Sequence, residues 1–237
     1  MTARPGSVAN LPVRERRITL GHLPFLVAHP ADSEALVDAI DPAAPGAAET
    51  IPYWAEVWPA AVALGRHLVG LDLAGRRAIE LGAGVGLAGL AAARAGARVL
   101  LTDLSDEALD FARRNAELNG LAVECARLDW FEDGDAAPLG PFDLVLAADV
   151  LYERRFVDPI ARLVPRLLAG GGTALLADPR RPYAAEFAAA ILARGGDGEL
   201  ALTSRSTFLY WEGRGREIEL IAIERLTSRA APAARSR

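Results

Sequence analysis

The sequence predicts a doubly wound α/β fold, in which helices cover both faces of a largely parallel sheet. Residues 76–103 show the pattern of a strand, a glycine-rich turn, a helix and a second strand that ends at Asp103. Short apolar runs then alternate with helical stretches as far as residue 226, as is typical of βαβ units. The length of 237 residues and the hydrophobic fraction of 51% suit one such domain with short extensions.

The first fifty residues predict an N-terminal extension, residues 1–50. Residues 1–12 are polar and carry prolines and arginines, so we expect a loose chain end. Residues 17–30 hold two apolar runs around Gly21 and His22, which predicts a β-hairpin. Ser33 is a candidate N-cap for a short helix over 33–40, and the composition of 41–50 indicates a linker.

An aromatic stretch opens the main domain, which we expect to cover residues 51–226. Tyr53, Trp54 and Trp58 precede Pro59, which suits the first position of a helix over 60–69. That helix leads directly into the strand before the glycine turn, so its start can lie beside a ligand there. Aromatic faces attract cations, although the same rings could serve only to pack the N-terminal segment on the sheet.

The glycine turn predicts a nucleotide-like ligand. Gly82 and Gly84 follow the first strand at once, and glycine allows a sharp turn and a close approach of backbone to ligand. Residues 84–89 match the dinucleotide pattern G-x-G-x-x-G, with Asp103 about 20 residues on. However, Glu80 ends the first strand, and a carboxylate repels a pyrophosphate. S-adenosylmethionine has a ribose and cationic groups but no phosphate, and so suits Glu80 and Asp103 better.

Acidic residues stand at the predicted ends of four successive strands: Glu80, Asp103, Asp129 and Asp149. Ligands bind beyond the carboxyl ends of the strands in open α/β sheets, so we expect these four side chains in one site. Asp103 would accept hydrogen bonds from ribose hydroxyls. Asp129 and Trp130 would bind the adenine amino group and cover its ring, unless they are only a surface acid and an anchoring tryptophan.

The remaining elements follow in a regular order. Ser105 is a candidate N-cap, and Asn119 and Gly120 a candidate end, of a helix over 104–120. We further expect a third strand over 121–130, a fourth around 144–148, a helix over 159–172 with a glycine stop, a fifth strand over 173–181, a helix over 182–196, and a hairpin of strands at 199–211 and 216–225. Residues 227–237 predict a disordered tail.

Composition excludes several classes of function. A net charge of −5 argues against broad nucleic-acid binding, and one cysteine, Cys125, allows neither an intrachain disulfide nor a cysteine-based metal site. Arg94 and Arg98 interrupt the longest apolar stretch, and residues 1–17 have no apolar core of a signal peptide. We therefore expect a cytoplasmic protein without a membrane span or a metal. All 26 basic residues counted as Lys and Arg are arginine, so the chain has no lysine.

Together these segments resemble the class I, seven-β-strand methyltransferases that use S-adenosylmethionine. Within that class they resemble the protein-lysine methyltransferases of methyltransferase family 16, closest to the branch of the electron-transfer-flavoprotein β-subunit lysine methyltransferase. The resemblance rests on PYWAEVWPAAVAL, ELGAGVG, LLTD, LDWFE and AADVLYE, between residues 52 and 153. It implies a Rossmann-like doubly wound sheet of seven strands in the order 3-2-1-4-5-7-6, with the last strand antiparallel.

The resemblance also implies site residues. Cofactor contacts would come from Trp58, Gly82, Ala83, Gly84, Asp103, Trp130 and Ala148. Asp149 and Tyr152, the ends of an acid-x-x-aromatic motif, would face the acceptor amine as catalytic residues. Asp149 would orient the amine by a hydrogen bond, and Glu56 and Glu153 are candidate helpers. The histidines, His22, His29 and His67, lie outside the strand ends, so we expect surface or packing roles for them.

The sequence thus predicts an N-methyltransferase that converts S-adenosylmethionine to S-adenosylhomocysteine and methylates lysine side chains of a protein. By resemblance, that protein would be the electron-transfer flavoprotein β subunit or a ribosomal protein. The exit of the fourth strand lacks the Asn-Pro-Pro-Tyr pattern of enzymes that methylate amide or base nitrogens. A small-molecule N-methyltransferase on the same fold, a non-catalytic cofactor-binding scaffold and a nicotinamide-dependent dehydrogenase remain as alternatives.

Overall fold

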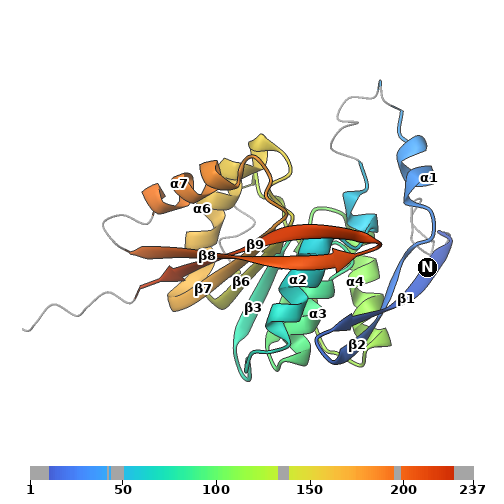
Figure 1. The fold of residues 1–237 in the computed structure, drawn as a ribbon, viewed down its shortest axis with the longest axis horizontal. Coiled ribbons are helices and arrows are strands. Elements are labelled where there is room, and N and C mark those ends of the chain that lie inside the picture. Colours follow the sequence, from blue (N-terminus) through green and yellow to red (C-terminus); the bar gives the residue numbers. More distant parts are fainter. Residues whose placement is uncertain (1–10, 42, 44–50, 133–138, 195–198, 227–237) are drawn as a thin grey trace, which may run out of the picture.

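A computed structural model describes residues 11–41, 43, 51–132, 139–194 and 199–226. A seven-stranded sheet forms its centre, with helices on both faces, and a two-stranded hairpin lies beside it (Figure 1). The strand order is β5-β4-β3-β6-β7-β9-β8, which corresponds to 3-2-1-4-5-7-6 along the chain. β9 runs antiparallel to both of its neighbours, β7 and β8, and the other strand pairs of this sheet are parallel. The predicted fold class, strand order and antiparallel last strand are therefore confirmed.

The parallel part of the sheet positions the site. Its strands are β5 (Glu124–Arg127), β4 (Arg98–Asp103), β3 (Arg77–Leu81), β6 (Phe142–Ala148) and β7 (Leu168–Asp178). Side chains alternate between the two faces of a strand, and β6 shows the result. Leu144 and Leu146 enter the core beneath α2 and α3, whereas Val145 and Ala147 enter the core beneath α6 and α7.

Helices cover both faces of the sheet (Figure 1). One face carries α2 (Pro59–Leu68), α3 (Leu87–Arg94) and α4 (Asp106–Leu118), and the other carries α6 (Val157–Leu167) and α7 (Ala184–Arg194). Pro59 takes the first position of α2, and the Ser105 hydroxyl accepts a hydrogen bond from Ala108 N at 3.1 Å as the N-cap of α4. Both capping predictions are confirmed.

Two of the boundaries that differ from the sequence prediction affect how the site is read. β5 is limited to Glu124–Arg127, so Asp129 and Trp130 lie in the turn that follows the strand. α6 ends at Leu167, and the glycines predicted to stop it lie inside β7. The register between β6 and β7 shifts there, and Gly171 has φ +78°, which glycine adopts without strain. The glycines form a bulge in a strand, not a helix end.

The predicted N-terminal hairpin is present as β1 (Val13–Leu20) and β2 (Leu23–Pro30). Its β2 backbone pairs with two side-chain amides of α4. Asn115 exchanges hydrogen bonds with the N–H and the C=O of Ala28, at 2.6 and 3.0 Å, and Asn119 does the same for Leu26, at 3.0 and 2.6 Å. The two asparagines therefore replace a neighbouring strand.

A short helix, α1 (Ser33–Asp38), follows the hairpin. The prediction that Ser33 caps this helix is wrong. The cap is Asp32, whose extended backbone lets its carboxylate accept a hydrogen bond from Ala35 N at 2.9 Å. Ser33 is the first helical residue, and its hydroxyl donates instead to the Glu56 carboxylate.

The last two strands, β8 (Leu200–Trp211) and β9 (Arg214–Arg225), form the predicted hairpin. Glu212 and Gly213 connect them, and both have positive φ, as a type I′ hairpin turn requires. The Arg16 guanidinium donates to Glu212 at 2.6 Å and lies 4.8 Å above the Trp211 ring. The first and last hairpins of the described chain are thus in direct contact.

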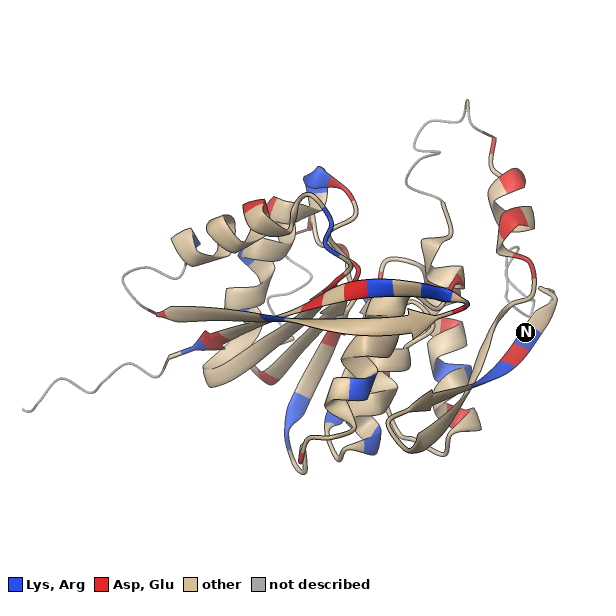
Figure 2. Cartoon of the chain, in the orientation of Figure 1, with Lys and Arg blue, Asp and Glu red and all other residues tan. Residues whose placement is uncertain are grey.

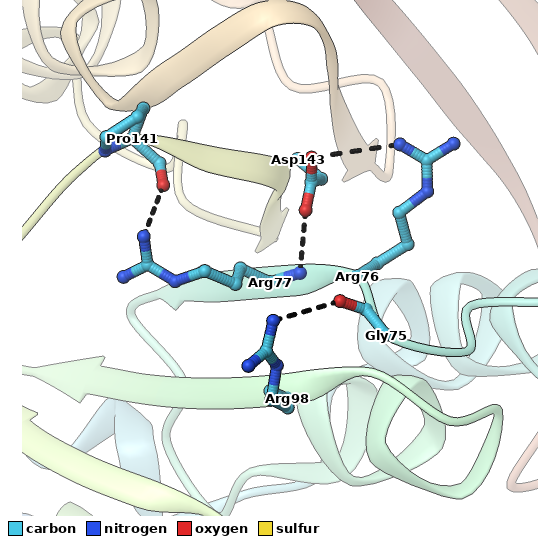
Figure 3. A network of polar contacts seen from close by, with 6 residues as sticks. All are labelled: Gly75, Arg76, Arg77, Arg98, Pro141 and Asp143. Atoms are coloured by element: carbon cyan, nitrogen blue, oxygen red, sulfur yellow. Dashed lines mark hydrogen bonds and ion pairs between the residues drawn. The ribbon is translucent and has the colours of Figure 1, made fainter.

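A polar network closes the edge of the sheet where the parallel strands begin (Figure 3). Arg77 N donates to Asp143 at 2.9 Å, and the Arg77 guanidinium donates to Pro141 O at 2.8 Å. Arg98 donates to Gly75 O at 3.2 Å. Figure 2 shows basic residues at this lower end of β3. Side chains thereby satisfy backbone groups at this edge, and the opposite edge holds the acids of the candidate site.

Candidate active site

A cleft of about 1510 Å³ opens at the carboxyl ends of β3 to β6. Its walls come from segments 51–58, 82–87, 103–107, 128–131 and 148–156, together with Arg181. Every predicted site residue lines this cleft: Trp58, Glu80, Gly82, Ala83, Gly84, Asp103, Asp129, Trp130, Ala148, Asp149 and Tyr152. The structure therefore brings the whole set together, while the role of each residue stays a prediction.

The glycine turn lies against two tryptophans. Gly82 and Gly84 have φ values of +63° and +54°, a region that other residues enter only with strain. A Cβ on Gly82 would lie 2.9 Å from the Trp130 indole, and one on Gly84 would lie 3.3 Å from Trp54 O. The turn leaves no room for side chains here, so its backbone forms the cleft wall.

Asp103 fixes the turn to the end of β4. Its Oδ2 accepts a hydrogen bond from Gly84 N at 2.8 Å, and its Oδ1 accepts one from Ser105 N at 3.0 Å. Burial raises the pKa of Asp103, although both hydrogen bonds act to lower it. The side chain thus presents carboxyl oxygens beside the turn, where they can accept hydrogen bonds from ligand hydroxyls.

Glu80 lies beneath the turn and is only 2% exposed. Its Oε2 accepts a hydrogen bond from Gly89 N at 2.8 Å. Burial, assisted by the nearby charge of Asp103, raises the pKa of Glu80 to about 8. Near neutral pH this carboxyl group is therefore largely protonated. A protonated carboxyl group does not repel a phosphate, so the sequence argument that Glu80 disfavours a pyrophosphate does not hold in this structure.

Aromatic rings line the outer side of the cleft. The Tyr152 ring packs 5.1 Å from that of Tyr53 and 4.9 Å from that of Phe156, and Trp130 packs edge-on against Phe156 at 5.4 Å. Trp58 Nε1 donates to Tyr53 O at 2.7 Å. Burial raises the pKa of Tyr152 to about 12, so its phenol stays neutral. These rings give the cleft a largely aromatic lining.

Asp149 and Arg181 form an ion pair in the cleft. Asp149 follows β6 with φ +57°, and its N–H donates to Ala177 O at 2.8 Å, which holds the strained backbone on β7. Arg181 Nε donates to Asp149 Oδ1 at 2.9 Å. The Asp149 side chain is 5% exposed. The carboxylate predicted to face the acceptor is therefore already beside a fixed cation.

Sequence reasoning missed Arg181 and Phe156, and treated Tyr53 only as part of an aromatic stretch. Asp178 ends β7, a fifth strand-terminal acid that the same rule would have included. Arg181, three residues later, could have been found from it. The two candidate helpers, Glu56 and Glu153, do line the cleft. Glu153 pairs there with Arg155 at 2.8 Å.

Other candidate groups lie elsewhere or are absent. None of the three histidines, His22, His29 and His67, is among the residues that line the cleft. In the described ranges, no group of three His, Cys, Asp or Glu side chains is placed to hold a metal ion. Within those same ranges, no helix combines the length and apolar character needed to cross a membrane.

Comparisons with known proteins agree with this geometry. A family model described as lysine methyltransferase matches residues 53–191, more than half of the chain. Among curated proteins, the chain is 40% identical over 129 residues to the protein N-lysine methyltransferase METTL21A of Danio rerio. It is 37% identical over 122 residues to the histone-arginine methyltransferase METTL23 of Xenopus laevis. It is 34% identical over 135 residues to the electron transfer flavoprotein beta subunit lysine methyltransferase of Xenopus laevis.

These matches cover 52%, 49% and 55% of this chain, and 59%, 52% and 53% of the relatives. The chain thus matches little more than half the length of each relative. The flavoprotein branch is not specifically favoured, because the two other relatives match at higher identity.

Solved structures show the same fold. SMU.776 complexed with SAH superposes with a TM-score of 0.64 at 13% identity, covering 89% of this chain and 56% of that chain. Ribosomal protein L11 methylase from Lactobacillus delbrueckii subsp. bulgaricus gives 0.52 at 24% identity, covering 69% and 77%. With the matching family model and the cleft at the strand ends, the chain belongs to the lysine methyltransferase family of class I, S-adenosylmethionine-dependent methyltransferases.

Proposed function

We propose that this protein methylates lysine side chains of a protein substrate. The observation that carries the proposal is that one cleft holds both a glycine turn and the Asp149-x-x-Tyr152 exit of β6. The turn and Asp103 suit the donor, and the β6 exit suits the acceptor. A protein that only binds the donor, as a scaffold, would not need the acceptor-side residues at the exit of β6.

The cleft residues fit S-adenosylmethionine. The Gly82–Gly84 backbone and the Trp130 ring form a close wall for the adenosine, and Asp103 offers acceptors for the ribose hydroxyls. Both arginines among the lining residues, Arg155 and Arg181, are paired with carboxylates. These arginines are therefore not free to bind a pyrophosphate, and one amide of the turn, Gly84 N, already donates to Asp103.

The acceptor side of the cleft can align an amine. When bound, S-adenosylmethionine supplies an electrophilic methyl group, whose C–S bond breaks with both electrons left on sulfur as the acceptor nitrogen bonds to carbon. Asp149 holds the acceptor nitrogen by a hydrogen bond, and Tyr53 and Tyr152 restrict its approach and exclude water. Alignment of this kind supplies much of the rate of a displacement reaction.

The acceptor in our proposal is lysine, since the matching family model is described by that residue. Relatives named for arginine match at almost the same identity, so arginine is the second candidate acceptor. The electron-transfer flavoprotein β subunit remains one proposed target among others, and a cytoplasmic location is part of the proposal.

The test is incubation of the protein with a lysate and S-adenosylmethionine labelled on the methyl group, followed by mass spectrometry. We expect label on the lysines of one or a few proteins. The enzyme has no lysine, so no lysine signal can come from the enzyme itself. Label on arginine would favour the second candidate, and label confined to metabolites would contradict a protein substrate.

Asp149→Ala provides the matched variant. We expect a loss of transfer of at least about a hundredfold, because the acceptor loses its hydrogen-bond partner, with S-adenosylhomocysteine binding retained. Asp110→Ala, an exposed aspartate on α4, is the control. Full transfer by Asp149→Ala would show that Asp149 does not orient the acceptor.

Calorimetry with S-adenosylhomocysteine and with NAD separates the methyltransferase from a dehydrogenase.

A further inference from the structure

Two consecutive hydrogen bonds connect the end of β7 to Asp149 through Arg181. Asp178, the last residue of β7, accepts a hydrogen bond from Arg181 N at 2.6 Å. Arg181 Nε in turn donates to Asp149 Oδ1 at 2.9 Å. The Asp178 side chain is almost completely buried, and its Oδ2 has no partner. Asp178 thus fixes the backbone of the residue whose side chain neutralises Asp149.

The backbone on both sides of this contact is strained. Asp149 has φ +57° and Arg180 has φ +62°, and neither residue is glycine. Left-handed backbone costs such residues about 1 kcal/mol, and strain of this kind concentrates at functional sites. Arg180 points its guanidinium to Glu217, at 2.7 Å, whereas Arg181 lines the cleft. The loop therefore directs one of two adjacent arginines to Asp149.

The charged and titratable groups around the pair come from several elements. Asp178 on β7 and Tyr53 on η3 (Tyr53–Ala55) face Arg181, and Glu219 on β9 faces Asp178. Tyr152 stands beside Glu153, Arg155 and Asp103. Burial keeps the pKa of Tyr152 at about 12, so its phenol is neutral near pH 7, and Arg155 pairs with Glu153. The charge of Asp149 is therefore opposed mainly by Arg181.

We propose that Arg181 is a positioning residue that makes the acceptor end of the cleft select a neutral amine over an ammonium ion. The inference rests on the proposed function. An unpaired Asp149 carboxylate would attract the ammonium form of lysine, which has no lone pair and cannot accept a methyl group. With a guanidinium on Oδ1, the carboxylate still accepts a hydrogen bond from an amine but attracts a second cation much less. The proton that the acceptor loses passes to solvent.

Binding of two small probes tests this without turnover. The probes are n-butylammonium, a cation at pH 7, and n-butanol, its neutral counterpart. Their dissociation constants are measured by NMR titration in the presence of S-adenosylhomocysteine and 0.1 M salt. The preference is the ratio of the two dissociation constants, and we expect Arg181→Gln to shift this ratio about tenfold in favour of the cation. Arg181→Lys, which keeps the charge, should stay within about threefold of the wild type.

The control and a second variant complete the test. Arg180→Gln removes the same charge from the same loop but away from the cleft, and should leave the preference unchanged. Asp178→Asn keeps an acceptor for Arg181 N and removes a buried charge near the guanidinium, so the preference should shift about threefold away from the cation. S-adenosylhomocysteine binding shows whether each variant is folded.

An unchanged preference in folded Arg181→Gln, or a shift away from the cation, overturns the proposal. If that variant does not fold, an unchanged preference in Asp178→Asn overturns it. Because the probes bind without methyl transfer, a failure here leaves the proposed function untouched. Conversely, absence of methyl transfer in every lysate would refute the function while the probe preference still shifted. With an identified substrate, the rising limb of the pH–rate profile should shift to higher pH by about one unit in Arg181→Gln, because the ammonium form of the acceptor is then favoured in the cleft.

Discussion

Glu80 shows how burial makes a single carboxyl group sensitive to pH. The unfolded chain ionises this group near its ordinary pKa of 4.5, whereas the folded protein holds the proton up to about pH 8. The folded state therefore binds more protons over this window. Its stabilising contribution is complete below pH 4.5 and is lost as the pH rises through 8.

Glu80→Gln should remove this pH dependence. Glutamine copies the protonated carboxyl group and still accepts a hydrogen bond from Gly89 N. Between pH 5 and 8, wild type should lose on the order of 3 kcal/mol more unfolding free energy than the variant. Urea unfolding at both pH values measures the difference. Equal losses in the two proteins would mean that Glu80 is ionised in the folded state.

Gly82 and Gly120 form a matched pair for the glycine turn, because both have φ +63°. A Cβ on Gly120 would meet nothing within 4 Å, so Gly120→Ala should cost only about 1 kcal/mol of backbone strain. Gly82→Ala adds a clash with Trp130 and should also weaken S-adenosylhomocysteine binding at least about tenfold. Calorimetry on both variants checks this, and similar affinities would argue that the turn does not contact the ligand.

Single residues also show what the sequence could and could not predict about the site. Asp103 and Asp149 were found because strand-terminal acids in a parallel sheet must meet at one edge. Arg181 was missed because Asp178, the strand-terminal acid three residues before it, was not included in the set. The left-handed backbone of Arg180, which turns Arg181 towards Asp149, is visible only in the structure. The raised pKa of Glu80 could also be recognised only from the structure, because its cause is burial by residues distant in sequence.

Among the elements, α4 supports both the hairpin and the glycine turn. Asn115 is fully buried and binds Ala28 at two atoms, and its Nδ2 also donates to Val85 O at 2.9 Å. Val85 belongs to the turn after β3. One amide therefore connects β2, α4 and the wall of the cleft.

Asn115→Ala should leave buried backbone groups of Ala28 and Val85 without partners. We expect a loss on the order of 3 kcal/mol of unfolding free energy and a measurable decrease in S-adenosylhomocysteine affinity. Glu117→Ala, on the exposed side of the same helix, is the control for helix propensity and should change stability by less than about 0.5 kcal/mol. A loss below about 1 kcal/mol for Asn115→Ala would show that water satisfies these groups.

Elements with strong local patterns were predicted well. α4 has a cap, acids in its first turn and a glycine after its end, and β6 is an apolar run. The start of β7 was misassigned because glycines after a helix usually end it, and the bulge that uses them exists only against β6. Likewise, Asp32 and Ser33 are both good caps, and the contact of Ser33 with Glu56 decides between them.

For the molecule as a whole, the cleft walls come from segments on both sides of the sheet centre. S-adenosylhomocysteine at a hundred times its dissociation constant should stabilise the protein by about 2.7 kcal/mol. Hydrogen exchange should slow most in segments 51–58, 82–87 and 148–156. The turn at Glu212 and Gly213, remote from the cleft, should change least. Uniform slowing across the described chain would indicate that exchange requires global unfolding.

The overall topology was predictable because the order of strands follows from a family resemblance and from right-handed crossovers. The position of the N-terminal hairpin against α4 could not be predicted from the sequence, because the hydrogen bonds between them join residues about ninety positions apart. The family model matches from residue 53 onwards, so it says nothing about how the hairpin of β1 and β2 packs.

The contact of Arg16 with Glu212 and Trp211 has a consequence for biosynthesis. β9 lies between β7 and β8, so the large sheet is continuous only after the last of its strands has left the ribosome. All segments that wall the cleft are synthesised before that strand. During translation the hairpin of β1 and β2 can pack on α4 early, but Arg16 can contact Trp211 and Glu212 only after those residues have been synthesised. A nascent chain stalled before residue 214 would therefore carry every cleft residue on a sheet whose β7 edge is still open to aggregation.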